Sequence, residues 1–141
     1  MTSLPTELLV LFVLAVMAAS LWIPYIVGVN TAAPGSVSEE APDGFVRPAD
    51  FRMQRPWVQR AYRAHLNLLE QFLPFAVVVL LLDRAGAFSA LTLWTCVVFL
   101  LLRLTHAAGY ITGRTGFPLR PLIFTGGWLC ILVLAGALAV S

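Results

Sequence analysis

Four apolar runs, each long enough to cross a lipid bilayer, constrain this chain more than any other feature. They cover approximately residues 4–29, 57–82, 88–111 and 121–140. A transmembrane helix needs about 20 predominantly apolar residues, and the runs lack the alternation of polar and apolar positions that is typical of strands. We therefore predict an all-α integral membrane protein, a single domain of residues 1–141 that forms an up-down four-helix bundle.

Composition and charge agree with this class. Of the 141 residues, 60% are apolar and only 11% are charged, whereas about a quarter of a soluble domain is charged. All nine basic residues are arginines, and the formal net charge of +2 gives no indication of a nucleic-acid partner. The first run follows no basic segment and is too long for the core of a signal peptide, so we interpret it as an uncleaved transmembrane helix.

The arginines predict an orientation in the membrane. Residues 30–56 form a long connector rich in proline, glycine and charge, and a connector of this length is typically a lid, a binding loop or disordered. Eight arginines belong to this connector, to the connector before the fourth run, or to the adjoining helix ends: Arg47, Arg52, Arg55, Arg60, Arg63, Arg103, Arg114 and Arg120. The positive-inside rule places both connectors in the cytoplasm and both termini outside. We expect a bacterial inner membrane protein with its site near the cytoplasmic face.

The second run begins with a polar stripe. At about 100° per residue on a helix, five residues fall within a sector of roughly 80°: Arg60, Arg63, Asn67, Glu70 and Pro74. His65 points to about the opposite side. Because each charged side chain near the centre of a bilayer costs several kcal/mol unless it is paired or hydrated, we expect something polar to face this stripe.

A second polar stripe lies at the end of the third run, at the same membrane face. Arg103, His106, Tyr110 and Arg114 also share a sector of about 80°. Basic groups outnumber the single carboxylate of Glu70, so the two stripes together predict a pocket for an anionic ligand. Arginine suits carboxylates because its planar fork forms two parallel charge-assisted bonds. A ligand with several carboxylates and an amine would satisfy this set better than a simple lipid would.

Simpler interpretations remain open for each of these residues. Arg60 and Arg63 would also reach lipid headgroups, and Glu70 would also form a structural salt bridge. Asn67 would also bond a neighbouring helix, and Tyr110 would also belong to an interfacial belt. The pair His65 and His106 raises the alternative of a bis-histidine haem. Cys96 and Cys130 lack metal-ligand spacing, so we expect no metal site and interpret them as small buried hydrophobes.

Two motifs carry a resemblance to a known family. The segment Arg60-Ala-Tyr-Arg-Ala-His-Leu-Asn-Leu-Leu-Glu-Gln-Phe-Leu-Pro-Phe75 resembles the signature of the MAPEG family, the membrane-associated proteins of eicosanoid and glutathione metabolism. It is most similar to the microsomal glutathione transferase branch. The segment His106-Ala-Ala-Gly-Tyr110 and the later Phe-Pro-Leu-Arg120 resemble two further elements of the family.

The resemblance implies a homotrimer that binds glutathione as a cosubstrate between its subunits. Arg63, Asn67 and Glu70 match positions that hold the tripeptide, Arg60 and His65 match flanking positions, and Tyr110 matches a tyrosine near the ligand. Arg120 best matches the arginine that stabilises the thiolate, and Arg114 is the other candidate because the connector aligns only with a gap. The implied activity is that of a transferase or peroxidase acting on small lipophilic electrophiles or lipid hydroperoxides. The alternative is a non-catalytic protein that binds an anionic amphiphile or acts as a scaffold.

Overall fold

The computed structural model describes residues 4–31 and 54–141, and this part of the chain is all-helical with no strand. Its elements are α1 (Thr6–Ser20), α2 (Ile23–Asn30), α3 (Pro56–Ala85), α4 (Ala90–Thr112) and α5 (Leu119–Ala139). The predicted all-α fold class is confirmed. Most of the connector predicted at 30–56 lies outside the described residues, and so do Arg47 and Arg52.

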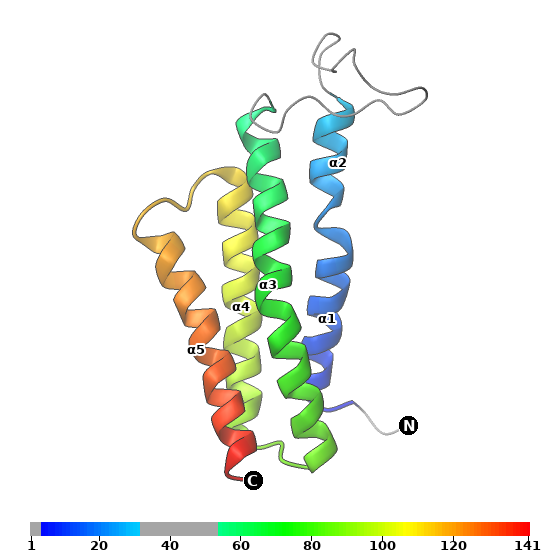
Figure 1. Cartoon of the computed structure of the whole chain (residues 1–141), viewed down its shortest axis with the longest axis vertical. Coiled ribbons are helices and arrows are strands. Elements are labelled where there is room, and N and C mark those ends of the chain that lie inside the picture. Colours follow the sequence, from blue (N-terminus) through cyan, green and yellow to red (C-terminus); the bar gives the residue numbers. More distant parts are fainter. Residues whose placement is uncertain (1–3, 32–53) are drawn as a thin grey trace.

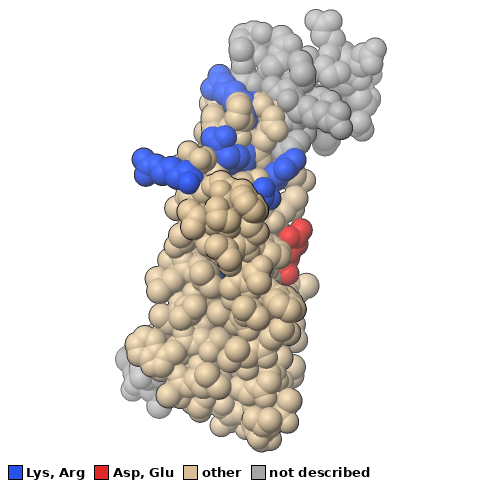
Figure 2. Space-filling view, turned by 90° about the vertical axis from the view of Figure 1, so that its left-hand side faces the viewer, with Lys and Arg blue, Asp and Glu red and all other residues tan. Residues whose placement is uncertain are grey.

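The helices form an antiparallel bundle in which successive spans run in opposite directions (Figure 1). Four stretches are long and apolar enough to cross a membrane: Thr6–Asn30, Pro56–Ala85, Ala90–Thr112 and Leu119–Ala139. They differ from the predicted runs by a few residues at their ends. We call the end of the bundle where α3 begins, α4 ends and α5 begins the arginine end, because Arg55, Arg60, Arg63, Arg114 and Arg120 lie there. On the face shown in Figure 2, arginines gather at this end, and the other end shows none.

The first span is divided in two. A turn at Leu21 and Trp22 separates α1 from α2, and Pro24 lies in the first turn of α2. Proline has no N–H to donate, and its ring clashes with the carbonyl four residues earlier, here that of Ser20. A proline at this point of an apolar run predicts a kink or a loosened last turn. The structure has a break here: α1 ends at Ser20 and α2 begins at Ile23, one residue before the proline.

The ends of α3 and α4 follow standard capping chemistry. Gly86 and Gly113 terminate the two helices with φ values of 64° and 75°, a left-handed conformation that glycine adopts without penalty. Ser89 caps α4 by accepting a hydrogen bond from the backbone N–H of Thr92, whose hydroxyl in turn accepts from the N–H of Ser89. The caps at Gly86 and Ser89 make the connection between α3 and α4 short. The two helices form an antiparallel hairpin, so the start of α3 lies beside the end of α4.

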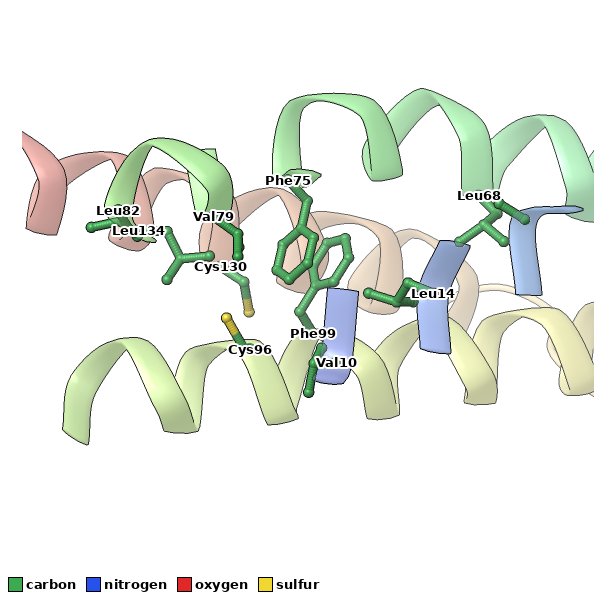
Figure 3. Packing of buried hydrophobic residues seen from close by; sticks show 11 residues of the cluster. Val10, Leu14, Leu68, Phe75, Val79, Leu82, Cys96, Phe99, Cys130 and Leu134 are labelled. Carbon is green, nitrogen blue, oxygen red and sulfur yellow. The ribbon is translucent and has the colours of Figure 1, made fainter. Parts of the chain in front are cut away.

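The hydrophobic core is built from apolar side chains of α1, α3, α4 and α5 (Figure 3). The rings of Phe75 and Phe99 stack at its centre, with 4.1 Å between centroids. Cys96 and Cys130 are buried free thiols that point toward each other from α4 and α5. The predicted packing of both cysteines inside the apolar core is therefore confirmed.

Candidate functional site

The polar residues of α4 lie on its buried face. Arg103, His106 and Tyr110 are 2%, 3% and 7% exposed, and the rings of His106 and Tyr110 stack with centroids 5.6 Å apart. The spacing of these three residues predicted a common sector, and all three face the interior of the bundle. Arg114 does not continue this face. The left-handed Gly113 ends α4 before it, so helical spacing no longer applies, and Arg114 is exposed.

Two polar side chains hold α5 against the hairpin. The Nη2 of Arg103 donates to the carbonyl of Ile123 at 2.9 Å, and the Nε2 of Gln71 donates to the next carbonyl, that of Phe124, also at 2.9 Å. Both side chains converge on Gly127, where a Cβ atom would meet the Oε1 of Gln71 and lie 2.6 Å from the Nη2 of Arg103. Gly127 therefore lets α5 approach close enough for both bonds to form.

The larger cavity of the site lies between α3, α4 and α5. Its volume is about 410 Å³, and its lining combines polar side chains with an apolar wall on α5: Asn67, His106, Arg120, Pro121, Phe124 and Thr125. The guanidinium of Arg120 stacks over the ring of Tyr110, with 4.5 Å between Cζ and the ring centroid. A cation held over an aromatic face is attracted by the ring quadrupole, so this contact holds Arg120 at the cavity wall.

A smaller cavity lies between the start of α3 and Tyr110 of α4. Its volume is about 290 Å³, and it is lined by Pro56, Gln59, Arg60, Arg63 and Tyr110. The Nε of Arg60 also donates to the carbonyl of Ile111 at 3.2 Å, in the last turn of α4. Arg60 thus satisfies one of the carbonyls that the helix end leaves without an intrahelical partner. Tyr110 lines one cavity and contacts Arg120 of the other, so it forms part of the wall between them.

The polar stripe of α3 lies beside the core face of this helix. Each stripe residue directly precedes a buried residue, and a step of one residue turns the helix by about 100°. The buried positions are Ala61, Ala64, Leu68, Gln71 and Phe75. Arg63 and Glu70 are accordingly exposed in the single chain, and Asn67 and His65 are partly buried.

The structure brings together only part of the predicted set. Asn67, His106 and Arg120 share the larger cavity, and Arg60, Arg63 and Tyr110 share the smaller one. Glu70, His65, Arg103 and Arg114 line neither of these two cavities. Sequence reasoning overlooked Gln71, which packs at i+4 from Asn67 on the same helix, as well as the cavity wall formed by Pro121, Phe124 and Thr125.

Two observations on the described residues bear on the metal and haem alternatives. Among residues 4–31 and 54–141, no group of three or more histidine, cysteine or acidic side chains could hold a metal ion. A bis-histidine haem would need both imidazoles in one cavity, but His106 lines the larger cavity and His65 lines neither of the two cavities described.

A comparison of the sequence with models of known protein families gives one match. The family model described as MAPEG family matches residues 8–140, nearly the whole chain. No curated protein matches the chain. The matched range includes α3, α4 and α5, and therefore every residue that lines either cavity.

Proposed function

The chain belongs to the MAPEG family, and on that premise we propose that it is a membrane-embedded, glutathione-dependent transferase. Its function would be to activate the glutathione thiol toward lipophilic electrophiles or lipid hydroperoxides dissolved in the bilayer. The observation that carries this proposal is that Arg120, Asn67 and His106 line one cavity of about 410 Å³. That cavity combines hydrogen-bonding groups from α3 and α4 with a cation and apolar side chains from α5.

The arginine end supplies the charge that a peptide with two carboxylates needs. Arg60 and Arg63 line the smaller cavity next to Tyr110, and a guanidinium binds a carboxylate through two parallel charge-assisted bonds. In the proposed complex the peptide carboxylates lie against these two residues. The cysteine side chain of the peptide then extends past Tyr110 toward Arg120.

Arg120 is the better candidate for stabilising the thiolate. It lines the larger cavity and stacks on Tyr110, whereas Arg114 is exposed beyond the end of α4. A free thiol has a pKa near 8.5 and is mostly protonated at neutral pH, and an adjacent guanidinium favours its anionic form. A shift of one pKa unit corresponds to about 1.4 kcal/mol of preferential stabilisation of the anion.

The exposed charges on the flank of α3 favour an oligomer, which the resemblance implies is a homotrimer with the site between subunits. Arg63 and Glu70 are exposed in the single chain, although they lie on a helix that spans the membrane. Charged groups facing lipid are unfavourable, so a second subunit that covers this flank would remove them from the acyl chains. Glu70 would then accept a hydrogen bond from the ammonium group of the bound peptide.

Titration of the detergent-solubilised protein with glutathione tests the proposal. We expect saturable binding and the appearance of thiolate absorbance, followed by conjugation when a lipophilic electrophile such as an aryl halide is added. Binding without thiolate absorbance or turnover would instead support the non-catalytic alternative, in which the same arginines hold an anionic amphiphile. A preparation that does not bind glutathione would contradict the proposed function.

A further inference from the structure

Beneath the larger cavity, three polar side chains from α3 and α4 are almost completely enclosed. Gln71, Arg103 and His106 are 4%, 2% and 3% exposed. His106 is the member that reaches the cavity lining. Arg103 lies one helical turn before it, on the same face of α4. We call this cluster of Gln71, Arg103 and His106 the polar floor of the cavity. His106 is its only member that lines the cavity itself.

Only some of the polar atoms in this polar floor have hydrogen-bond partners. Within the part of the chain that the structure describes, the Nε and Nη1 of Arg103, the Nε2 of His106 and the Oε1 of Gln71 have no hydrogen-bond partner. Most buried polar groups in proteins do have one, and a buried guanidinium without a counter-charge is strongly unfavourable. An anionic group in the adjacent cavity would offset this imbalance, because it would bond the imidazole and interact with the guanidinium behind it.

We propose that the Nε2–H of His106 donates a hydrogen bond to the sulfur of the bound thiolate, and that Arg103 is a positioning residue that acts through His106. This inference rests on the proposed function and adds a second stabilising group to Arg120. The sulfur then lies between two donors of the same cavity, the guanidinium of Arg120 on α5 and the imidazole of His106 on α4.

The positive charge of Arg103 determines the form in which His106 would donate a hydrogen bond to the thiolate. Two positive charges one helical turn apart repel strongly in an apolar interior, so we assign His106 its neutral form, which has one N–H donor. A neutral imidazole donates a hydrogen bond to an anion without exchanging a proton with it. The guanidinium behind the ring strengthens this donor, and the stack on Tyr110 holds its orientation.

The reaction step balances without a proton from the protein. The thiol releases its proton to water, and the electron pair stays on sulfur while His106 and Arg120 donate to it. The sulfur then attacks the carbon of the electrophile, so that an S–C bond forms and the bond to the leaving group breaks. The leaving group departs with that electron pair, and His106 keeps its proton throughout.

The test compares His106→Leu, which removes the donor, with His106→Gln, which provides an amide N–H. Each protein is titrated with glutathione and, separately, with S-methylglutathione, which cannot form a thiolate. In His106→Leu we expect the ratio of thiolate to thiol in bound glutathione at neutral pH to fall about tenfold, equivalent to one pKa unit, while the affinity for S-methylglutathione stays unchanged. His106→Gln should restore most of the thiolate. Thr105→Leu, at the exposed neighbouring position on α4, is the matched control and should behave like the wild type.

Arg103 is tested in the same way with Arg103→Lys and Arg103→Met. The lysine variant keeps the charge and should retain most of the thiolate, whereas the methionine variant should lose about as much as His106→Leu. Melting temperatures measured in parallel identify variants that do not fold. If His106→Leu or Arg103→Met does not fold, the comparison of His106→Gln and Arg103→Lys with the wild type still tests the proposal.

Two results would overturn this inference alone. One is a thiolate fraction in His106→Leu equal to that of a thiolate-forming wild type. The other is an equal loss of affinity for glutathione and S-methylglutathione, which would indicate a purely structural role. A wild-type protein that forms no thiolate would instead overturn the proposed function on which the inference rests.

Discussion

The guanidinium of Arg120 lies over the ring of Tyr110, with its Cζ 4.5 Å from the ring centroid. The contact joins the first turn of α5 to the last turns of α4, across a connector that contains Gly113 and Gly116. A cation–π contact contributes about 0.5–1 kcal/mol when it is exposed and about 2 kcal/mol or more when it is desolvated. Tyr110 is buried, so this contact determines where the charge of Arg120 lies in the cavity.

Replacement of Arg120 should therefore impair the chemical step more than the binding of glutathione. For Arg120→Ala we expect kcat to fall by about 10²–10³-fold, the usual effect of removing one donor to a developing anion, with a smaller change in the dissociation constant. Stopped-flow measurement of thiolate formation separates the two quantities. Arg114→Ala is the paired comparison. If Arg114→Ala rather than Arg120→Ala abolished thiolate formation, the assignment would have to be reversed.

Tyr110→Leu should also weaken thiolate formation, because it releases Arg120 from the wall between the cavities. Tyr110→Phe keeps the aromatic ring and should retain most of the activity, so the pair separates the ring from its hydroxyl. The measurement is the thiolate fraction at a fixed pH with saturating glutathione. Equal losses in both variants would indicate that the hydroxyl, and not the stack on Arg120, is what matters.

Gly127→Ala should destabilise the bundle. The new methyl group would meet the side chains of Gln71 and Arg103, and overpacking of this kind costs about 1–3 kcal/mol. It would also loosen the two hydrogen bonds that these side chains donate to α5. Gly136→Ala is the control on the same helix, because nothing lies within 4 Å of its new Cβ. Thermal unfolding in detergent should show a lower midpoint for Gly127→Ala alone.

Gly113→Ala tests the link between the cap of α4 and Arg60. An alanine at φ 75° is strained by about 1–2 kcal/mol, and its Cβ would lie 3.2 Å from the Cζ of Arg60. Gly86→Ala carries similar strain at φ 64° but has nothing within 4 Å. We expect both variants to lose stability and only Gly113→Ala to lose affinity for glutathione. Calorimetric titration measures this difference, and an equal affinity in the two variants would remove Arg60 from the binding site.

The apolar runs were sufficient to predict the fold class. A run of about 20 apolar residues has few alternatives to a membrane span, so the four spans followed from length and composition. The division of the first span at Leu21 and Trp22 was harder to predict from the sequence, because a proline within an apolar run can either kink a helix or end it. Which of the two occurs depends on how α1 packs against α3 and α4 and on how α2 packs against α3.

The candidate site was only partly predictable, because helical spacing shows which residues share a face but not what that face contacts. Spacing grouped Arg63, Asn67 and Glu70, yet the core face of α3 is centred one residue further along, on positions such as Leu68 and Gln71. Asn67 and Glu70 each directly precede a buried residue, yet only Asn67 lines one of the two cavities. Gln71 was overlooked because its partner is a backbone carbonyl of α5, and no sequence pattern marks such a contact.

The exposed position of Glu70 leads to a prediction about the ligand. If a second subunit covers this flank and Glu70 accepts from the peptide ammonium, Glu70→Gln should weaken glutathione binding by about 10–100-fold, because a hydrogen bond to a charged group contributes about 1.5–3 kcal/mol. A glutathione analogue that lacks the amino group should bind the wild type and Glu70→Gln with equal affinity. The two proteins and two ligands form a cycle whose coupling energy isolates this contact. A coupling near zero would mean that the carboxylate of Glu70 does not contact the ammonium, and that Glu70 instead has a structural role between subunits.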